Sequence, residues 1–127
     1  MTSVSTCPCG SGRTFSACCG PILAGAAAAD AETLMRSRYC AYVLRDAAYL
    51  LATWHPDTRP TDLALNQEPL AKWLGLAVKR HEALSDAEAL VEFVARYKIN
   101  GRAFRLHETS RFLRLEGRWY YLNGNPA

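Results

Sequence analysis

The chain has 127 residues, of which half are apolar and 21% are charged, a composition typical of a compact globular domain and not of a disordered chain. Its formal net charge is only +3 and its lysines and arginines form no dense cluster, which argues against nucleic acid as a partner. The longest apolar run, ILAGAAAA, is far shorter than the ~20 residues of a membrane span, and the first residues lack the pattern of a signal peptide, so we expect a cytoplasmic protein with no membrane span.

The first element along the chain is a cluster of cysteines in the stretch TCPCGSGRTFSACCG, residues 6–20. It contains four of the five cysteines: Cys7, Cys9, Cys18 and Cys19. A redox pair has the pattern Cys-x-x-Cys after a strand, whereas here the pair is Cys-Pro-Cys with no strand before it. A disulfide between Cys18 and Cys19 would close a strained ring, and thiols stay reduced in the cytoplasm.

Metal binding explains the cluster better, because four thiolates fill a tetrahedral structural zinc site. Residues 1–20 offer only Phe15 and a few small side chains as a core, too little to offset an ordering cost of ~1–2 kcal/mol per residue. A structural zinc site contributes ~10 kcal/mol or more. The gaps between the cysteines are shorter than in most zinc sites, so their spacing alone does not decide whether the cluster binds zinc. One bound Zn²⁺ with four thiolates would lower the net charge to about +1.

Two helices are expected next. Asp30 is a typical N-cap before AETLMRSRYCAYVLRD, where apolar residues recur at helical spacing. Asp46 caps a second helix, AAYLLATWH, which should end at Pro56 because the residue before a proline avoids helical geometry. After a loop at 55–62, the segment EPLAKWL predicts a short third helix with Pro69 in its first turn.

The pattern changes to strands near Gly75. Four segments have β character, namely LGLAVKRHEAL, LVEFVARYKI, RAFRLHETSRFLRL and RWYYL. Asn100-Gly101 and Glu116-Gly117 provide tight turns between the last three. Helices followed by a four-stranded antiparallel meander predict an α+β fold.

The stretch CPCGSGRTFSACCG resembles the SEC-C motif, a short zinc-binding module known from the preprotein-translocation ATPase. Its pattern is Cys-x-Cys, eight residues, then Cys followed by Cys or His, and Cys7, Cys9, Cys18 and Cys19 match it. The resemblance implies one structural Zn²⁺ held by these four residues. It also implies a partner class, since the motif is associated there with binding a chaperone, the ribosome or lipid surfaces.

A second resemblance covers nearly the whole chain. LMRSRYCAYVLRDAAYLLATWHP, VEFVARYK and ETSRFLRLEGRWYYLNG are similar to signature blocks of the YchJ-like family. That family has an N-terminal SEC-C motif followed by an NTF2-like domain, a cone of helices against a curved antiparallel sheet. We therefore expect a zinc knuckle at 1–21 and an NTF2-like domain at 22–127. Many relatives carry a second, C-terminal SEC-C motif, which this sequence lacks.

Several residues are candidates for a pocket in the cone. Arg36 and Arg38 lie beside Tyr39 on the first predicted helix, and one of them could bind a carboxylate or phosphate in the cone. Adjacent charges on a helix more often indicate an exposed arginine beside a packed tyrosine. Trp54 and His55 lie at a helix end, where the histidine is either functional or a partner of nearby carbonyls.

Arg111 lies on the third predicted strand and could face inward, with Asp46 or Glu92 as its acidic partner. Cys40 lies outside the cluster, where a single cysteine is most often a small buried hydrophobe.

Three functions compete. In the first, the protein is an adaptor whose knuckle docks an unknown protein partner through an exposed face made by Arg13, Thr14 and Phe15, and whose cone holds a small ligand or acts as a scaffold. In the second, it is an isomerase-like or dehydratase-like enzyme, which a deep pocket with a carboxylate or histidine of perturbed pKa would favour. In the third, the knuckle binds RNA or the ribosome, against which the low net charge argues. The resemblance to NTF2-like domains, which often form dimers through the sheet, also allows a homodimer.

Overall fold

The computed structural model describes residues 6–63, 65 and 70–126. Its elements, in chain order, are the 3₁₀ turn η1 (Phe15–Ala17), α1 (Cys19–Leu23), α2 (Ala31–Leu44), α3 (Ala47–Ala52), β1 (Lys72–Ser85), β2 (Glu88–Ile99), β3 (Arg102–Leu115) and β4 (Arg118–Pro126). Among the helices of these segments, none has the length and apolar character needed to cross a membrane.

The four strands form one antiparallel sheet in the order β1-β2-β3-β4, which confirms the predicted meander and the α+β class. Both predicted turns are present. Asn100 and Gly101 have φ values of 52° and 79°, and Glu116 and Gly117 have 50° and 81°. Two successive residues with positive φ are the mark of the hairpin turn that matches the twist of the strands.

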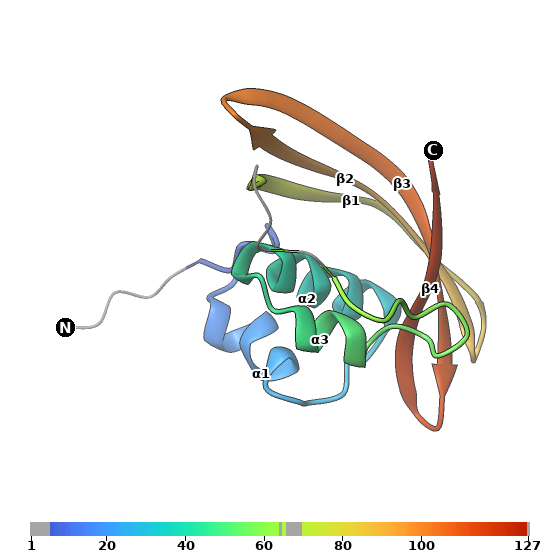
Figure 1. Cartoon of the computed structure of the whole chain (residues 1–127). Helices are drawn as coiled ribbons and strands as arrows, with labels where there is room; N and C mark the ends of the chain where they lie inside the picture. Colours follow the sequence, from blue (N-terminus) through green and yellow to red (C-terminus); the bar gives the residue numbers. More distant parts are fainter. Residues whose placement is uncertain (1–5, 64, 66–69, 127) are drawn as a thin grey trace.

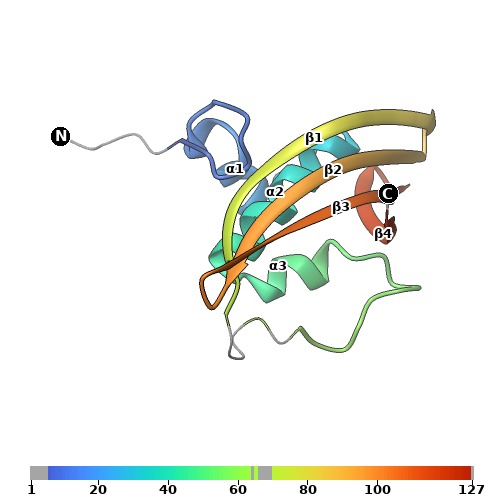
Figure 2. The same cartoon turned by 90° about the horizontal axis from the view of Figure 1, so that it is seen from above.

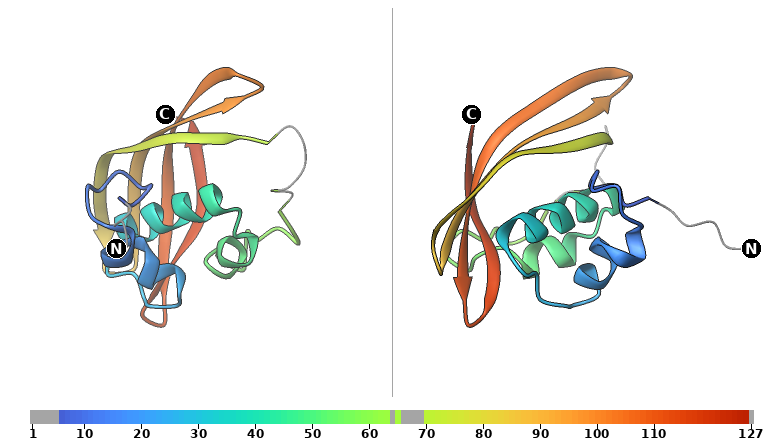
Figure 3. Two further views of the ribbon diagram at one scale, coloured as in Figure 1. Left: turned by 90° about the vertical axis from the view of Figure 1, so that its left-hand side faces the viewer. Right: turned by 180° about the vertical axis from the view of Figure 1, so that it is seen from behind.

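The sheet is strongly curved, and α2 lies within its curve while α3 lies beside it (Figures 1 and 2). The N-terminal segment with α1 lies at the end of the helical layer away from β4 (Figure 3). The core forms between α2 and the concave face of the sheet, with Leu34, Tyr39, Val91 and Phe112 among its buried members. This arrangement is the helix-on-curved-sheet cone that the resemblance implies.

Helix α2 begins where the sequence predicts. The Asp30 carboxylate accepts a hydrogen bond from the Thr33 amide at 2.8 Å, so it caps the helix as expected. Arg45, with φ of 56°, ends the helix in the left-handed conformation. The Asp46 carboxylate in turn accepts from the Tyr49 amide and caps α3.

The second helix is shorter than predicted. It ends at Ala52, and the predicted last residues, Trp54 and His55, run alongside β4 instead. The amide of Tyr121 donates to the carbonyl of Thr53 at 2.8 Å, and the amide of His55 donates to the carbonyl of Tyr121 at 2.7 Å. These bonds to β4 replace the helical bonds that the local pattern favours.

The predicted third helix is wrong in its second half. Residues 66–69 lie outside the described residues, Leu70 and Ala71 belong to no element, and Lys72–Leu74 open β1. Lys72 and Trp73 pair with Lys98 and Tyr97 of β2, and this pairing decides the conformation.

The N-terminal segment shares the core of the sheet domain. Cys7, Cys9 and Cys19 are buried in the same cluster as Leu34 and Tyr39. The predicted boundary between residues 21 and 22 falls inside α1. The cysteines therefore pack on the rest of the protein as well as on one another.

Candidate metal centre

The first two cysteines lie on a tight loop. The amide of Cys7 donates to the carbonyl of Arg13 at 2.8 Å, and Thr6 and Thr14 form an isolated antiparallel bridge that closes the loop. Gly10 has φ of 81°, and a Cβ at this position would lie 2.8 Å from the carbonyl oxygen of Leu76 on β1. A glycine is therefore required at position 10, because the loop must approach the sheet edge closely.

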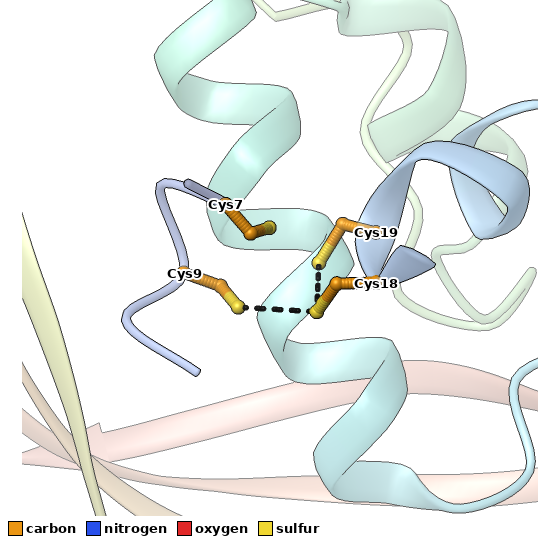
Figure 4. Close-up of side chains that lie close together, drawn as sticks. All are labelled: Cys7, Cys9, Cys18 and Cys19. Carbon is orange, nitrogen blue, oxygen red and sulfur yellow. Dashed lines mark hydrogen bonds between the residues drawn. The ribbon is translucent and has the colours of Figure 1, made fainter. Parts of the chain in front are cut away.

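The second two cysteines lie at the start of a helix. Cys18 follows η1 and is the residue before α1, and Cys19 is the first residue of α1. The turn brings Cys18 and Cys19 back towards the loop, so that all four side chains point to one centre (Figure 4).

The geometry of the four sulfurs fits a metal ion. All four Sγ atoms lie within 4.8 Å of one another. The Cys9–Cys18 and Cys18–Cys19 sulfur distances are 3.7 Å and 3.9 Å. Tetrahedral thiolates that each lie ~2.3 Å from a zinc ion are ~3.8 Å apart, whereas a disulfide bond is only ~2.0 Å long. The four cysteines are all free, and their sulfurs lie close enough together to hold one metal ion.

Polar groups around the cluster favour thiolates. Nη1 of Arg36 donates to the carbonyl of Cys9 at 2.8 Å and lies 4.0 Å from the Cys9 sulfur. The hydroxyl of Ser11 lies 3.2 Å from the sulfur of Cys18. The thiol of Cys19 lowers the pKa of Cys9, and contact with Cys40 raises the pKa of Cys19. Burial raises the pKa of Cys18, so of Cys9, Cys18 and Cys19 it is Cys9 that is most readily deprotonated.

The fifth cysteine adjoins the cluster. Cys40 on α2 is fully buried, as predicted, but its sulfur lies 3.5 Å from that of Cys7. It does not belong to the group of four sulfurs that surround one point.

A polar groove runs beside the cysteines. Its volume is about 230 Å³, and its lining comprises Arg13, Cys18, Cys19, Asp30, Glu32, Thr33 and Arg36. Arg36 also forms an ion pair with Glu32 at 3.0 Å. The groove therefore contains two cations and two carboxylates next to the candidate metal centre.

The predicted contact face is only partly exposed. Arg13 is exposed, and its guanidinium donates to the carbonyl of Ala17. Thr14 is half-buried, and so is Phe15, which packs against the core and close to Gly20. Phe15 therefore serves largely to hold α1, and Arg13 is the accessible member of the three.

A second cavity, of about 210 Å³, lies between α2 and the concave face of the sheet. Of the predicted pocket residues, Arg38 and Tyr39 line it. Arg38 is only 3% exposed, which corrects the expectation that an arginine here would face solvent. Its Nη1 donates to the carbonyl of Leu50 at 2.8 Å and to the hydroxyl of Thr53. Burial lowers the pKa of Arg38 to about 10.

The other predicted pocket residues lie elsewhere. Trp54 packs behind the cavity, under the Arg38 guanidinium and edge-on to Tyr121. His55 is buried and its Nδ1 accepts a hydrogen bond from the Asp57 amide at 3.0 Å, so it stabilises a turn. Arg36 belongs to the cysteine groove, as described above.

Arg111 is exposed and forms an ion pair with Glu88 at 2.9 Å. The prediction of an inward Arg111 with Asp46 or Glu92 is therefore wrong. Glu92 pairs with His107 instead, at 2.7 Å.

Sequence reasoning missed Glu108. This half-buried carboxylate lines the cavity and accepts a hydrogen bond from Ser110 at 3.3 Å. A Cβ on Gly124 would lie 2.6 Å from the Glu108 carboxyl group, so the glycine on β4 leaves the space that the carboxyl group occupies. Burial raises the pKa of Glu108. The alternation on β3 places Glu108 and Ser110 on one face, but only the packing of α2 makes that face a cavity wall.

Comparisons with known proteins agree with this fold and site. Residues 30–124 match a family model described as YchJ, middle NTF2-like domain, and residues 5–21 match the SEC-C motif. A UPF0225 protein of Chromobacterium violaceum is 58% identical, with 97% of this chain and 94% of the relative covered. A UPF0225 protein of Ralstonia nicotianae is 56% identical, with 95% of this chain and 91% of the relative covered.

Two solved structures are similar. One, a SEC-C motif containing protein from Rhodopseudomonas palustris, superimposes with a TM-score of 0.83 at 37% identity, covering 95% of this chain and 98% of the other. The second, a SEC-C motif containing protein from Psychrobacter arcticus, superimposes with a TM-score of 0.77 at 29% identity. The match covers 98% of this chain and 84% of the other.

Proposed function

The chain belongs to the YchJ-like family, with a SEC-C motif before the NTF2-like domain, and on that premise we propose that it is a zinc-dependent adaptor that docks a protein partner. The observation that carries the proposal is the group of four free cysteine sulfurs within 4.8 Å of one another, next to a polar groove. In this proposal the metal is structural, and the protein acts in the cytoplasm, where the thiols stay reduced.

Zinc is favoured by the chemistry of the ligands. Four thiolates suit a soft or borderline ion and do not suit Mg²⁺ or Ca²⁺, which take oxygen ligands. Four protein ligands also fill the tetrahedral shell, so a water or substrate has no open position on the ion. The metal would therefore supply folding free energy to the loop and α1, and no reaction is assigned to it.

The groove is where a partner would dock. Arg13 and Arg36 lie there among Asp30 and Glu32, so the surface has charges of both signs. Such a surface suits the mixed charges of a protein segment better than the uniform negative charge of a nucleic acid. Cys18 and Cys19 also line the groove, so loss of the metal would change the shape of the docking surface.

The experiment combines metal content with partner capture. Tagged wild type and three variants, Cys18→Ser/Cys19→Ser, Arg13→Glu and Lys79→Glu, are used as bait in cell lysate, and their zinc is measured by mass spectrometry. Lys79 is exposed on β1, away from the residues that line the groove, and serves as the matched charge-reversal control.

We expect one zinc per chain in all but the cysteine variant. A partner should be retained by wild type and Lys79→Glu and lost by the other two. Capture that does not distinguish Arg13→Glu from Lys79→Glu contradicts the docking role of the groove. A wild type without metal contradicts the zinc assignment.

A further inference from the structure

The cavity between α2 and the sheet contains two opposite charges that do not pair with each other. Arg38 and Glu108 both line it, and no ion pair joins them among the residues that the structure describes. Tyr121 lies beside both: the Arg38 guanidinium carbon is 4.6 Å from the centre of its ring, and burial together with the nearby Glu108 raises the pKa of its hydroxyl. One residue with donor groups and one with acceptor groups therefore line the same cavity.

Neither charge is fully satisfied by the protein. The hydrogen bonds of Arg38 to Leu50 and Thr53 both use Nη1, and its Nε and Nη2 donate to no other group among the described residues. The carboxylate of Glu108 accepts a single hydrogen bond, from the Ser110 hydroxyl, within the described residues. A half-buried carboxylate can accept several hydrogen bonds, so a group placed between the two side chains can bond to both.

The rest of the wall is apolar and largely aromatic. Tyr39 and Tyr42 each contact Trp73, with ring centres 5.8 Å and 5.7 Å from that of Trp73, and Phe93 and Leu106 are also part of the wall. Aromatic walls favour a flat ring as the body of a ligand. The volume of about 210 Å³ exceeds the ~150 Å³ that is enough to hold benzene, so a ring with one polar substituent fits.

We propose that this cavity binds a compact ring compound whose polar edge carries both an acceptor, which faces Arg38, and a donor, which faces Glu108, as in an aromatic carboxamide or a cyclic amide. Arg38 would donate to the carbonyl of the amide, Glu108 would accept from its N–H group, and the aromatic side chains would contact the ring of the ligand. This site is separate from the cysteine groove, and it goes beyond the metal-dependent docking proposed above.

The test uses three probes on the zinc-loaded full chain: benzamide, acetophenone and benzoate. Acetophenone has the shape of benzamide and its carbonyl acceptor but no N–H donor, and benzoate replaces the donor with a negative charge. Binding is followed by ¹H–¹⁵N NMR titration. We expect shifts confined to the amides around Arg38, Glu108 and Tyr121, and binding of benzamide at least tenfold tighter than that of either other probe.

Two variants assign the donor end. Glu108→Met removes the acceptor with little change in size, and should weaken benzamide about tenfold while leaving acetophenone unchanged. Glu92→Gln, on a carboxylate paired with His107 and absent from the cavity lining, is the control and should change neither.

The proposal is overturned if benzamide causes no shifts in the cavity, if acetophenone binds as tightly, or if Glu108→Met leaves their ratio unchanged. Should Glu108→Met not fold, the benzamide-to-acetophenone ratio on the wild type decides. Because every probe is titrated into metal-loaded protein, failure here does not bear on the zinc site or the groove.

Discussion

The sulfur of Cys40 lies 3.5 Å from the sulfur of Cys7, although 33 residues separate them in the chain. This contact joins α2 to the loop that carries the first two metal-ligand candidates. A fifth thiol so close could either share the ion or only pack against one of its ligands. The group of four sulfurs around one point does not include Cys40, and this favours packing.

We therefore predict that Cys40→Ala retains one metal ion per chain. The substitution removes one buried sulfur, so the free energy of unfolding should fall by only about 1 kcal/mol. Mass spectrometry of metal content and urea unfolding measure the two effects, with Cys18→Ser as the variant that should lose the ion. Loss of metal from Cys40→Ala would mean that Cys40 replaces one of the four ligands.

Arg36 of α2 contacts the loop that carries Cys7 and Cys9, because its Nη1 donates a hydrogen bond to the carbonyl of Cys9. We predict that Arg36→Met lowers zinc affinity at least tenfold, because a residue that orients a ligand and lies near its charge is lost. Competition with a chromophoric chelator measures the affinity. Arg114→Met, an exposed arginine on β3, is the control. Equal affinities in the two variants would show that Arg36 has no part in the site.

The cysteine cluster could be predicted from the sequence because the chemistry that suggests it is local. Four cysteines within thirteen residues, in a segment with few apolar side chains, favour a metal site, and the structure brings the four sulfurs together. The two hairpin turns were equally local, since Asn100-Gly101 and Glu116-Gly117 carry their own backbone preference. In each case the deciding interactions lie within a few residues of one another.

The cavity could not be predicted in the same way. Arg38 is buried because Leu50 of α3 and Tyr121 of β4 pack against it, whereas Arg111 is exposed and pairs with Glu88 of β2. Glu108 becomes a cavity residue only when α2 packs across the sheet. The start of β1 at Lys72 likewise depends on pairing with Lys98, 26 positions away. Such long-range contacts leave no periodic signal in a short window.

Metal removal should affect the N-terminal segment first. The amide of Cys7 donates to Arg13, and that of Cys18 to Phe15, within a segment that has little core of its own. We predict that chelation removes the hydrogen-exchange protection of these amides, while amides of β2 and β3 keep theirs. Because Cys7, Cys9 and Cys19 also belong to the main core, the thermal midpoint of the whole domain should fall as well. Unchanged protection of the Cys7 amide after complete chelation would contradict a structural metal.

Glu108 should make stability depend on pH in a defined direction. Burial raises its pKa in the folded state above the ordinary value of 4.5, so folding favours the protonated carboxyl group. Its favourable contribution is fully present below the unfolded pKa and is lost as pH rises through the folded pKa. Glu108→Gln remains neutral at every pH and cannot show this loss. We therefore predict that the thermal midpoint of Glu108→Gln minus that of wild type becomes larger as the pH rises from 4 to 8. Arg38, Tyr39 and Tyr121, which also line the cavity, have pKa values of about 10, about 12 and about 12, all above this range. A difference that is constant with pH, or that shrinks as pH rises, would mean that Glu108 is not held in a desolvated position.

A gain in stability on removing the charge would also fit a carboxylate kept in the cavity for a ligand, since binding groups commonly reduce stability.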